Sequence, residues 1–130
     1  MQIAGYLAGH EKVAAVYHPS LGGERYAGLA REHYRGYGGV VAFEVRGGDE
    51  AALRFMGGLK IPHVATSLGG VESLVSMPSN TSHSSLTSGQ RARIGINPGL
   101  VRFSAGIESV GDLILDLGNA LDALGEGDGR

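Results

Sequence analysis

An arginine in the middle of an apolar run is the residue of this chain that most strongly indicates chemistry. Arg102 lies in the run Leu100–Ala105, where strand alternation places its side chain opposite those of Val101 and Phe103. A guanidinium in such a place is costly unless its planar set of donors is satisfied. A ligand carboxylate can accept two parallel hydrogen bonds from it. There are two alternatives: an internal salt bridge, or an edge strand with the side chain in water. The spacing alone favours these alternatives over a bound ligand.

A turn with two adjacent glycines is the second candidate for a site. In Thr66–Gly70, which reads Thr-Ser-Leu-Gly-Gly, the glycines let backbone N–H groups approach an anion. The turn lacks the Gly-Lys-Ser/Thr ending of a nucleotide-binding P-loop. Ser-Leu-Gly-Gly is also typical of an ordinary turn, so both interpretations remain open at this point.

Other catalytic and metal-binding patterns are missing from the sequence. Cysteine is absent, which excludes disulfides, thiolate zinc sites and cysteine nucleophiles. The stretch Ser79–Ser88 contains no Gly-x-Ser-x-Gly elbow, so we interpret it as a polar surface loop. No two histidines have the spacing of a helical metal pair, and we expect no metal site. The histidines are His10, His18, His33, His63 and His83.

The overall composition is typical of one soluble globular domain. The 130 residues are 42% hydrophobic and 18% charged, with a formal net charge of −2. This charge provides no basic surface for nucleic acid or an anionic membrane. We find no apolar run near the roughly 20 residues of a membrane span and no basic, apolar signal sequence. We therefore expect a cytoplasmic protein.

Hydrophobic periodicity and capping residues indicate five helices that alternate with four strands. Thr87 with Gln90, and Ser109 with Asp112, have the spacing of capping boxes, and Asp49 can cap a third helix. The expected helices are the opening stretch through His10, Glu24–Arg35, a helix from Asp49 to Leu59, a helix from Thr87 to Gly95, and a helix from Ser109 to Gly125. The expected strands are Val13–Tyr17, Gly39–Val45, Glu72–Ser76 and Leu100–Ala105. This order predicts an α/β sandwich, a small sheet covered mainly on one side by helices.

Several ordered motifs give the chain a more specific resemblance. These motifs are Val13–Leu21, Gly36–Glu44, Leu59–Lys60, Ser67–Leu74, Met77–Pro78, Thr81–His83, Gly95–Ile96, Gly99–Glu108, Asp112–Ile114 and Asp116–Leu117. Together they resemble the C-terminal signature of the cystathionine γ-synthase, cystathionine γ-lyase and methionine γ-lyase family of pyridoxal-phosphate (PLP) enzymes. The resemblance covers nearly the whole chain.

The resemblance implies a particular architecture. Residues 1–124 would form the C-terminal, small domain of a transsulfuration-type enzyme, and Gly125–Arg130 a flexible tail. The sheet would be small and mostly antiparallel with helices on one face, as in the C-terminal domain of fold-type I PLP enzymes. The cofactor-binding domain would be absent from this chain.

The resemblance also implies substrate-binding residues. Arg102 matches the family arginine that holds the substrate α-carboxylate, and Ser67 matches the serine beside that carboxylate. Thr66 would line the distal end of the substrate pocket, where members acting on cystathionine often have glutamate. Leu68 belongs to the same substrate-binding turn. The threonine leaves methionine γ-lyase-like or related chemistry open.

The family chemistry needs PLP, which is held in the complete enzyme by residues of the larger domain. The two lysines of this chain, Lys12 and Lys60, do not match the lysine that forms the internal aldimine. We therefore expect that this chain alone binds no cofactor, has no catalytic residue and is inactive. The complete enzyme would carry out γ-elimination or γ-replacement on a sulfur-containing amino acid.

The partner of this chain would then be a cofactor domain or a second copy of itself. The inner face, with the Ser67 turn and Arg102, would pack toward the cofactor domain. The alternative is a stand-alone, non-catalytic domain that binds a partner chain or a small amino acid.

Overall fold

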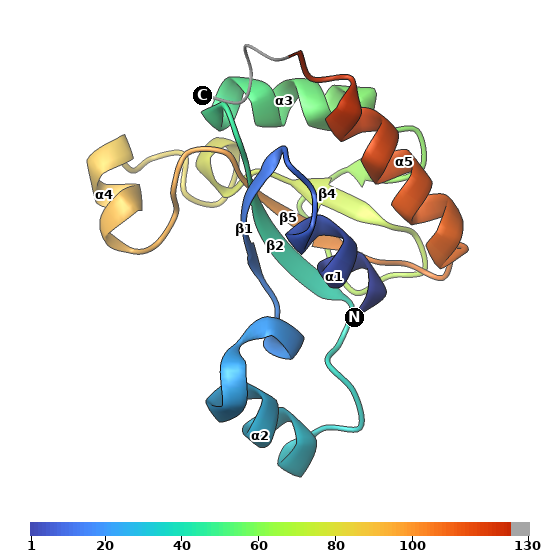
Figure 1. Ribbon diagram of the computed structural model, residues 1–130. Coiled ribbons are helices and arrows are strands. Elements are labelled where there is room, and N and C mark those ends of the chain that lie inside the picture. The colour runs from blue at the N-terminus through green and yellow to red at the C-terminus, as the bar shows by residue number, and fades with distance from the viewer. Residues whose placement is uncertain (126–130) are drawn as a thin grey trace.

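A five-stranded sheet forms the centre of the protein (Figure 1). The computed structural model describes residues 1–125. The strand order is β1-β2-β5-β4-β3, and all neighbours are antiparallel except β3 and β4, which are parallel. The strands are β1 (Val13–Tyr17), β2 (Val40–Val45), β3 (His63–Val64), β4 (Leu74–Ser76) and β5 (Leu100–Ser104). The mostly antiparallel sheet is as expected, and β5, which carries Arg102, is its central strand.

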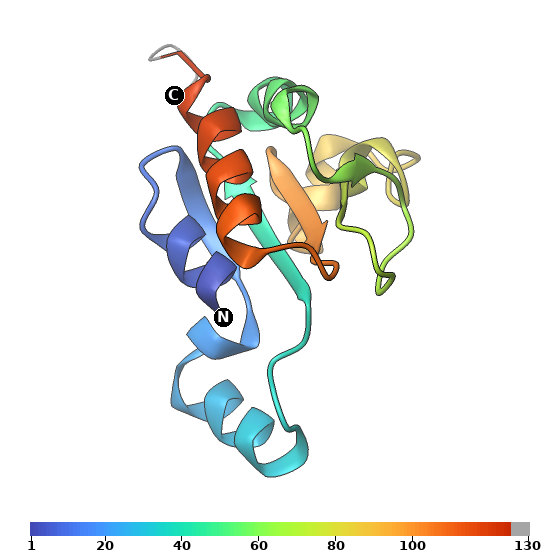
Figure 2. The same cartoon turned by 90° about the vertical axis from the view of Figure 1, so that its right-hand side faces the viewer.

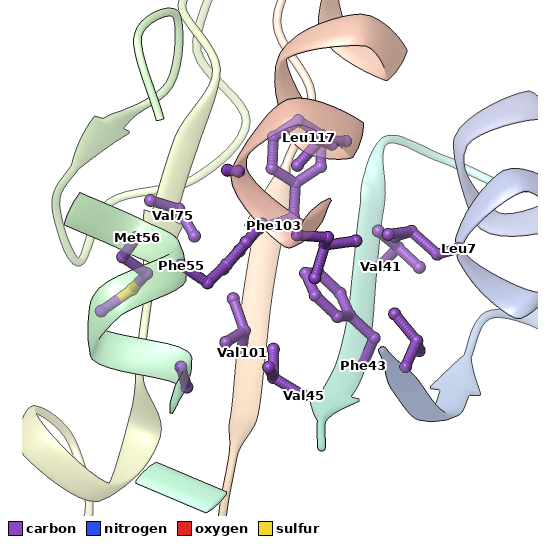
Figure 3. Close-up of a cluster of buried hydrophobic side chains, with 14 of the residues drawn as sticks. Leu7, Val41, Phe43, Val45, Phe55, Met56, Val75, Val101, Phe103 and Leu117 are labelled. Atoms are coloured by element: carbon purple, nitrogen blue, oxygen red, sulfur yellow. The ribbon is translucent and has the colours of Figure 1, made fainter. Parts of the chain in front are cut away.

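Three helices cover one face of this sheet (Figures 1 and 2). They are α1 (Gln2–Ala8), α3 (Gly48–Gly58) and α5 (Val110–Asp122). Their buried side chains join those of Val101 and Phe103 on β5 in one hydrophobic core. Figure 3 shows this cluster, in which Phe43 of β2 meets Phe55 of α3 edge to face with ring centroids 5.6 Å apart. The core therefore fixes the apolar side of β5 and leaves its other side for different contacts.

Two helices lie away from the core. The helix α2 (Gly23–His33) extends from one end of the sheet, and α4 (Ser88–Arg93) lies on the side opposite α5 (Figure 1). Only Ala30 of α2 is buried, and none of α4. Two short 3-10 helices, η1 (Pro19–Leu21) and η2 (Pro78–Asn80), complete the described elements.

Two of the three predicted N-terminal helix caps are confirmed. Thr87 and Gln90 form the expected capping box, and the Ser109 side chain accepts from the backbone N–H of Asp112. The prediction that Asp49 caps a helix is wrong, because α3 begins after Gly47, which has φ 97°. The Asp49 carboxylate instead accepts from the backbone N–H of Gly99 at 2.7 Å.

The remaining differences concern ends and one short strand. The predicted helix Glu24–Arg35 ends at His33, and the predicted helix from Ser109 to Gly125 ends at Asp122. The sequence did not predict β3, which has two residues and forms by pairing with β4. Of the predicted tail, residues 126–130 lie outside the described part of the chain. Within residues 1–125 there is no helix of the length and apolarity required to cross a membrane.

Candidate functional site

Arg102 lies on the face of the sheet that the core helices do not cover. Its cross-strand partners are Ala42 on β2 and Ser76 on β4. Directly paired residues share a face, so Arg102 has a small side chain on each side. The arginine is half-buried, whereas its neighbours Val101 and Phe103 are completely buried in the core. The alternation predicted from the sequence is confirmed, and the small neighbours leave the guanidinium accessible.

The structure brings Arg102 together with the turn that the sequence singled out. The Nη2 atom of Arg102 donates to the carbonyl oxygen of Thr66 at 2.5 Å and to that of Ser67 at 3.2 Å. Among residues 1–125, no carboxylate forms an ion pair with Arg102. Since β5 is also a central strand, neither alternative explanation from the sequence accounts for this arginine.

The turn itself is exposed but anchored. Thr66, Ser67 and Leu68 are exposed, and 53% of the Leu68 surface is accessible to solvent. Gly69 has a φ of 76°, a conformation that side-chain-bearing residues rarely adopt, and its N–H donates to Ser104 Oγ at 3.0 Å. The amide of Gly69 is therefore engaged by β5, so it is not one of the donors that the turn offers to an anion.

Ser104 is a residue that sequence reasoning did not assign to the site. It lies two positions after Arg102 on the same face of β5 and is only 2% exposed. Its hydroxyl accepts the Gly69 N–H, which attaches the turn to the strand. The available signal in the sequence was a polar residue two positions from Arg102, on the same face of the strand.

A second group of contacts fixes the chain after the turn. The Glu108 carboxylate accepts from Ser73 N at 2.8 Å and from Ser73 Oγ at 2.8 Å. Ser73 is completely buried, and its Oγ accepts in turn from Gly106 N at 2.9 Å. The Ser73 N–H bond to the carboxylate is the main cause that lowers the pKa of Glu108. Sequence reasoning included Glu108 in a motif but gave it no role.

Another acidic residue on the open side of the sheet has its own partners. The Glu44 Oε1 atom accepts from Tyr17 OH at 2.6 Å and from Asn97 Nδ2 at 2.8 Å. The bond to Glu44 is the main cause that raises the pKa of Tyr17. Glu44 therefore bonds to Tyr17 and Asn97 and does not form an ion pair with Arg102.

The two lysines of the sequence lie elsewhere. Lys12 Nζ donates to the carbonyl oxygen of Gly125 at 3.3 Å, next to the end of α5. The backbone N–H of Lys60 donates to Asp116 of α5. These contacts place Lys12 Nζ and the backbone of Lys60 next to helix α5. The described residues also contain no cluster of His, Cys, Asp and Glu suited to a metal ion.

Comparison with known proteins gives consistent matches over almost the whole chain. The model of the family described as Cys/Met metabolism PLP-dependent enzyme matches residues 1–122. Cystathionine gamma-lyase of Dictyostelium discoideum is 39% identical over 92% of this chain and 31% of its own length. L-methionine gamma-lyase of Pseudomonas putida is 41% identical over 93% of this chain and 30% of its own length.

Solved structures agree with these matches. The crystal structure of a cystathionine gamma-lyase from Micromonospora echinospora superimposes with a TM-score of 0.86 and 33% sequence identity. That superposition covers 95% of this chain and 32% of the other one. The chain therefore spans only a minor part, 22% to 32%, of the relatives it matches.

Proposed function

Because the chain belongs to the family of PLP-dependent enzymes of cysteine and methionine metabolism, we propose that residues 1–124 are the C-terminal, substrate-facing domain of such an enzyme. The relatives are between three and five times longer than the region matched, as the coverage of 22% to 32% requires. The remaining length would contain the cofactor domain. The complete enzyme would carry out γ-elimination or γ-replacement on a sulfur-containing amino acid.

The observation that carries this proposal is the position of Arg102. A guanidinium on a central strand, without an acidic partner among residues 1–125, has a planar fork that suits an added carboxylate. Its small neighbours Ala42 and Ser76 leave room for a ligand above the sheet. We assign to Arg102 the binding and orientation of the substrate α-carboxylate.

The turn supplies the other substrate contacts in this proposal. Ser67 lies beside the arginine, whose Nη2 reaches its carbonyl oxygen, and would contact the same carboxylate. Thr66 and Leu68 flank Ser67 and would face the rest of the substrate. Thr66 places no negative charge there, which favours a substrate without a distal amino group, such as methionine, over cystathionine.

PLP would be held by residues outside this chain. Lys12 and Lys60 adjoin the helical layer on the far side of the sheet. The open face around Arg102 would then pack toward the cofactor domain, and the isolated chain would be inactive. In this arrangement the chain's task is to bind and orient the substrate carboxylate against chemistry performed by the other domain.

A chimera tests the proposal. This chain would replace the matching segment of the Pseudomonas putida L-methionine gamma-lyase, to which it is 41% identical. Arg102→Ala should lower kcat/KM for methionine about 10- to 100-fold, because it removes a charge-assisted contact of roughly 1.5–3 kcal/mol. Arg102→Lys should restore part of the activity, since an ammonium lacks the planar fork.

Arg46→Ala is the matched control, because Arg46 also donates to a backbone carbonyl, that of Glu11, at the far end of β2. It should leave kcat/KM unchanged. Equal activity of the Arg102 and Arg46 variants would contradict the assignment of Arg102.

A further inference from the structure

The segment from Thr66 to Ser73 is not held in place by hydrophobic burial. Leu68, in the turn, is 53% exposed, and Val71, between the turn and β4, is 69% exposed. A segment whose apolar side chains face water gains little from the hydrophobic effect. Its position must depend mainly on hydrogen bonds, and those bonds can be named.

Glu108 provides the charged contact of this segment. Both of its carboxylate oxygens accept from Ser73, one from the backbone N–H and the other from the hydroxyl, each at 2.8 Å. Hydrogen bonds to an ionised acceptor are stronger than neutral ones. Because Ser73 is completely buried, water cannot easily replace the carboxylate. Loss of Glu108 would leave a buried N–H and a buried hydroxyl without this acceptor.

The backbone next to Glu108 is packed so closely that position 106 has no room for a side chain. A Cβ atom on Gly106 would lie 2.3 Å from the Val71 carbonyl oxygen and 2.5 Å from Glu108 Oε2. The same carbonyl accepts from Ile107 N at 2.9 Å. The backbones around Gly106 and Val71 are therefore in direct contact, and the Glu108 carboxylate lies next to this contact.

The turn is thus attached at both flanks. On its N-terminal side Arg102 reaches the carbonyl oxygens of Thr66 and Ser67, and in its middle Ser104 accepts from Gly69. On its C-terminal side Glu108 holds Ser73. If the contact of Glu108 is removed, the turn keeps the bonds to Arg102, which must also bind the ligand, and the single bond from Gly69 to Ser104.

We propose that Glu108 is a positioning residue: by fixing Ser73 it holds the Thr66–Gly70 turn, with Ser67, beside Arg102. The consequence for substrate binding rests on the function proposed above, whereas the effect on the turn does not. His63 is the titratable group that acts electrostatically on Glu108 from the neighbouring segment, and its Nε2 atom lies 3.6 Å from the carboxylate of Glu72. The backbone N–H of His63 donates to the carbonyl oxygen of Ser73 at 2.9 Å. The N–H and the hydroxyl of Ser73 bond to Glu108.

The effect on the turn is measured by amide hydrogen exchange in the full 130-residue chain. Glu108→Ala should speed exchange of the Gly69 and Ser73 amides about 10-fold or more, the loss expected for one or two charged hydrogen bonds. The core amide of Val101 should be unchanged. Glu72→Gln is the matched control, because this exposed glutamate of the same segment makes no bond to Ser73.

A second variant keeps the test valid if the alanine form folds poorly. Glu108→Gln retains size and one acceptor oxygen but cannot titrate, so it should show a smaller increase in exchange. In the wild-type chain the chemical shift of the Ser73 amide should follow the titration of Glu108, with a pKa below the ordinary value of glutamate. That titration should vanish in Glu108→Gln and persist in Glu72→Gln. An unchanged Ser73 and Gly69 exchange in both Glu108 variants would overturn the proposal.

The methionine γ-lyase chimera separates this proposal from the function on which it rests. Glu108→Ala should raise KM at least about 5-fold with little change in kcat, as loss of uniform substrate binding does. If Arg102→Ala lowers kcat/KM but Glu108→Ala leaves KM unchanged, the positioning claim fails and the proposed function stands. If Arg102→Ala has no effect, the proposed function fails, and the exchange measurement alone decides whether Glu108 positions the turn.

Discussion

Arg102 donates from Nη2 to the carbonyl oxygen of Thr66 at 2.5 Å, a contact between residues 36 positions apart in the sequence. The arginine thus holds the same turn that is proposed to contact the substrate. A carboxylate that occupies the guanidinium fork would share the Nη2 donor with Thr66 and Ser67 or replace one of them. Ligand binding and the position of the turn are therefore linked through one side chain.

The purified chain mixed with PLP should show no specific aldimine absorbance above that of a control protein with the same number of lysines. The physical reason is that Lys12 and Lys60 adjoin the helical layer rather than the face of Arg102. Absorbance titration with PLP checks this prediction. A saturable internal-aldimine band that disappears in Lys12→Ala or Lys60→Ala would refute it.

The isolated chain should self-associate in a concentration-dependent manner. Besides the open sheet face, Tyr26 and Leu29 of α2 are 58% and 48% exposed, and Tyr34, which directly follows α2, is 71% exposed. Exposed apolar surface gathered in one region tends to bind a partner. Light scattering over a range of concentrations checks this, and Tyr26→Ser combined with Tyr34→Ser should shift the protein toward monomer.

Leu115→Ser is the control for that experiment, because Leu115 is 63% exposed on α5, away from α2. It should leave the association unchanged. A strictly monomeric wild-type chain at high concentration would count against the prediction.

The free energy of unfolding should fall as the pH drops below about 6.5, the ordinary pKa of histidine, in part because of His18. Burial lowers the pKa of this histidine, so the folded state favours the neutral ring. Its Nδ1 accepts from the backbone N–H of Ser20 at 3.2 Å, which a protonated ring cannot do. The stability is present above the ordinary pKa and is lost as the pH falls through the folded-state pKa.

Urea denaturation at several pH values checks the role of His18. His18→Asn can still accept from Ser20 but does not titrate, so its stability should depend less on pH in this window. His33→Asn, an exposed histidine on α2, is the control and should keep the wild-type dependence. Parallel pH curves for the wild-type and His18→Asn proteins would show that His18 does not contribute.

Asp116→Ala should lower the free energy of unfolding by about 2–3 kcal/mol. Asp116 of α5 is buried and accepts from the backbone N–H groups of Lys60 and Ile61, which follow α3. Its removal leaves two donors without their acceptor. Urea denaturation measures the loss, and Asp116→Asn should cost less because it keeps one oxygen.

Asp112→Ala is the control for Asp116, since Asp112 is an exposed residue in the first turn of the same helix. It should cost no more than about 1 kcal/mol, the usual limit for an exposed charge near a helix N-terminus. Equal losses in the two variants would argue against the bridging role of Asp116.

Local patterns were sufficient to predict most of the secondary structure. The alternation of Val41, Phe43 and Val45 depends on a period of two residues, which the sequence displays directly. The short strand β3 has no such pattern of its own and forms through its pairing with β4. Asp49 fits a capping position locally, but its carboxylate is used by Gly99, 50 residues away, which no local rule can anticipate.

In the candidate site, too, local patterns predicted some features, whereas others depend on contacts between distant residues. Arg102 was singled out because a charged residue in an apolar strand needs a partner, and the family resemblance joined it to the turn at Ser67. The contacts that hold this turn could not be predicted, because Ser104 with Gly69 and Glu108 with Ser73 join residues 35 positions apart. Such contacts depend on the strand order β5-β4-β3, which the sequence did not determine.

The claim that Arg102 serves a ligand rather than the fold is tested most directly by urea denaturation of Arg102→Ala beside the wild-type chain. Arg102 makes no ion pair with a carboxylate among residues 1–125, and the core lies on the other side of β5. We predict a loss of no more than about 1 kcal/mol, typical of changes outside the core. A loss of roughly 3–5 kcal/mol, the size expected when a buried charged network is broken, would show that Arg102 is a structural residue and would contradict the account.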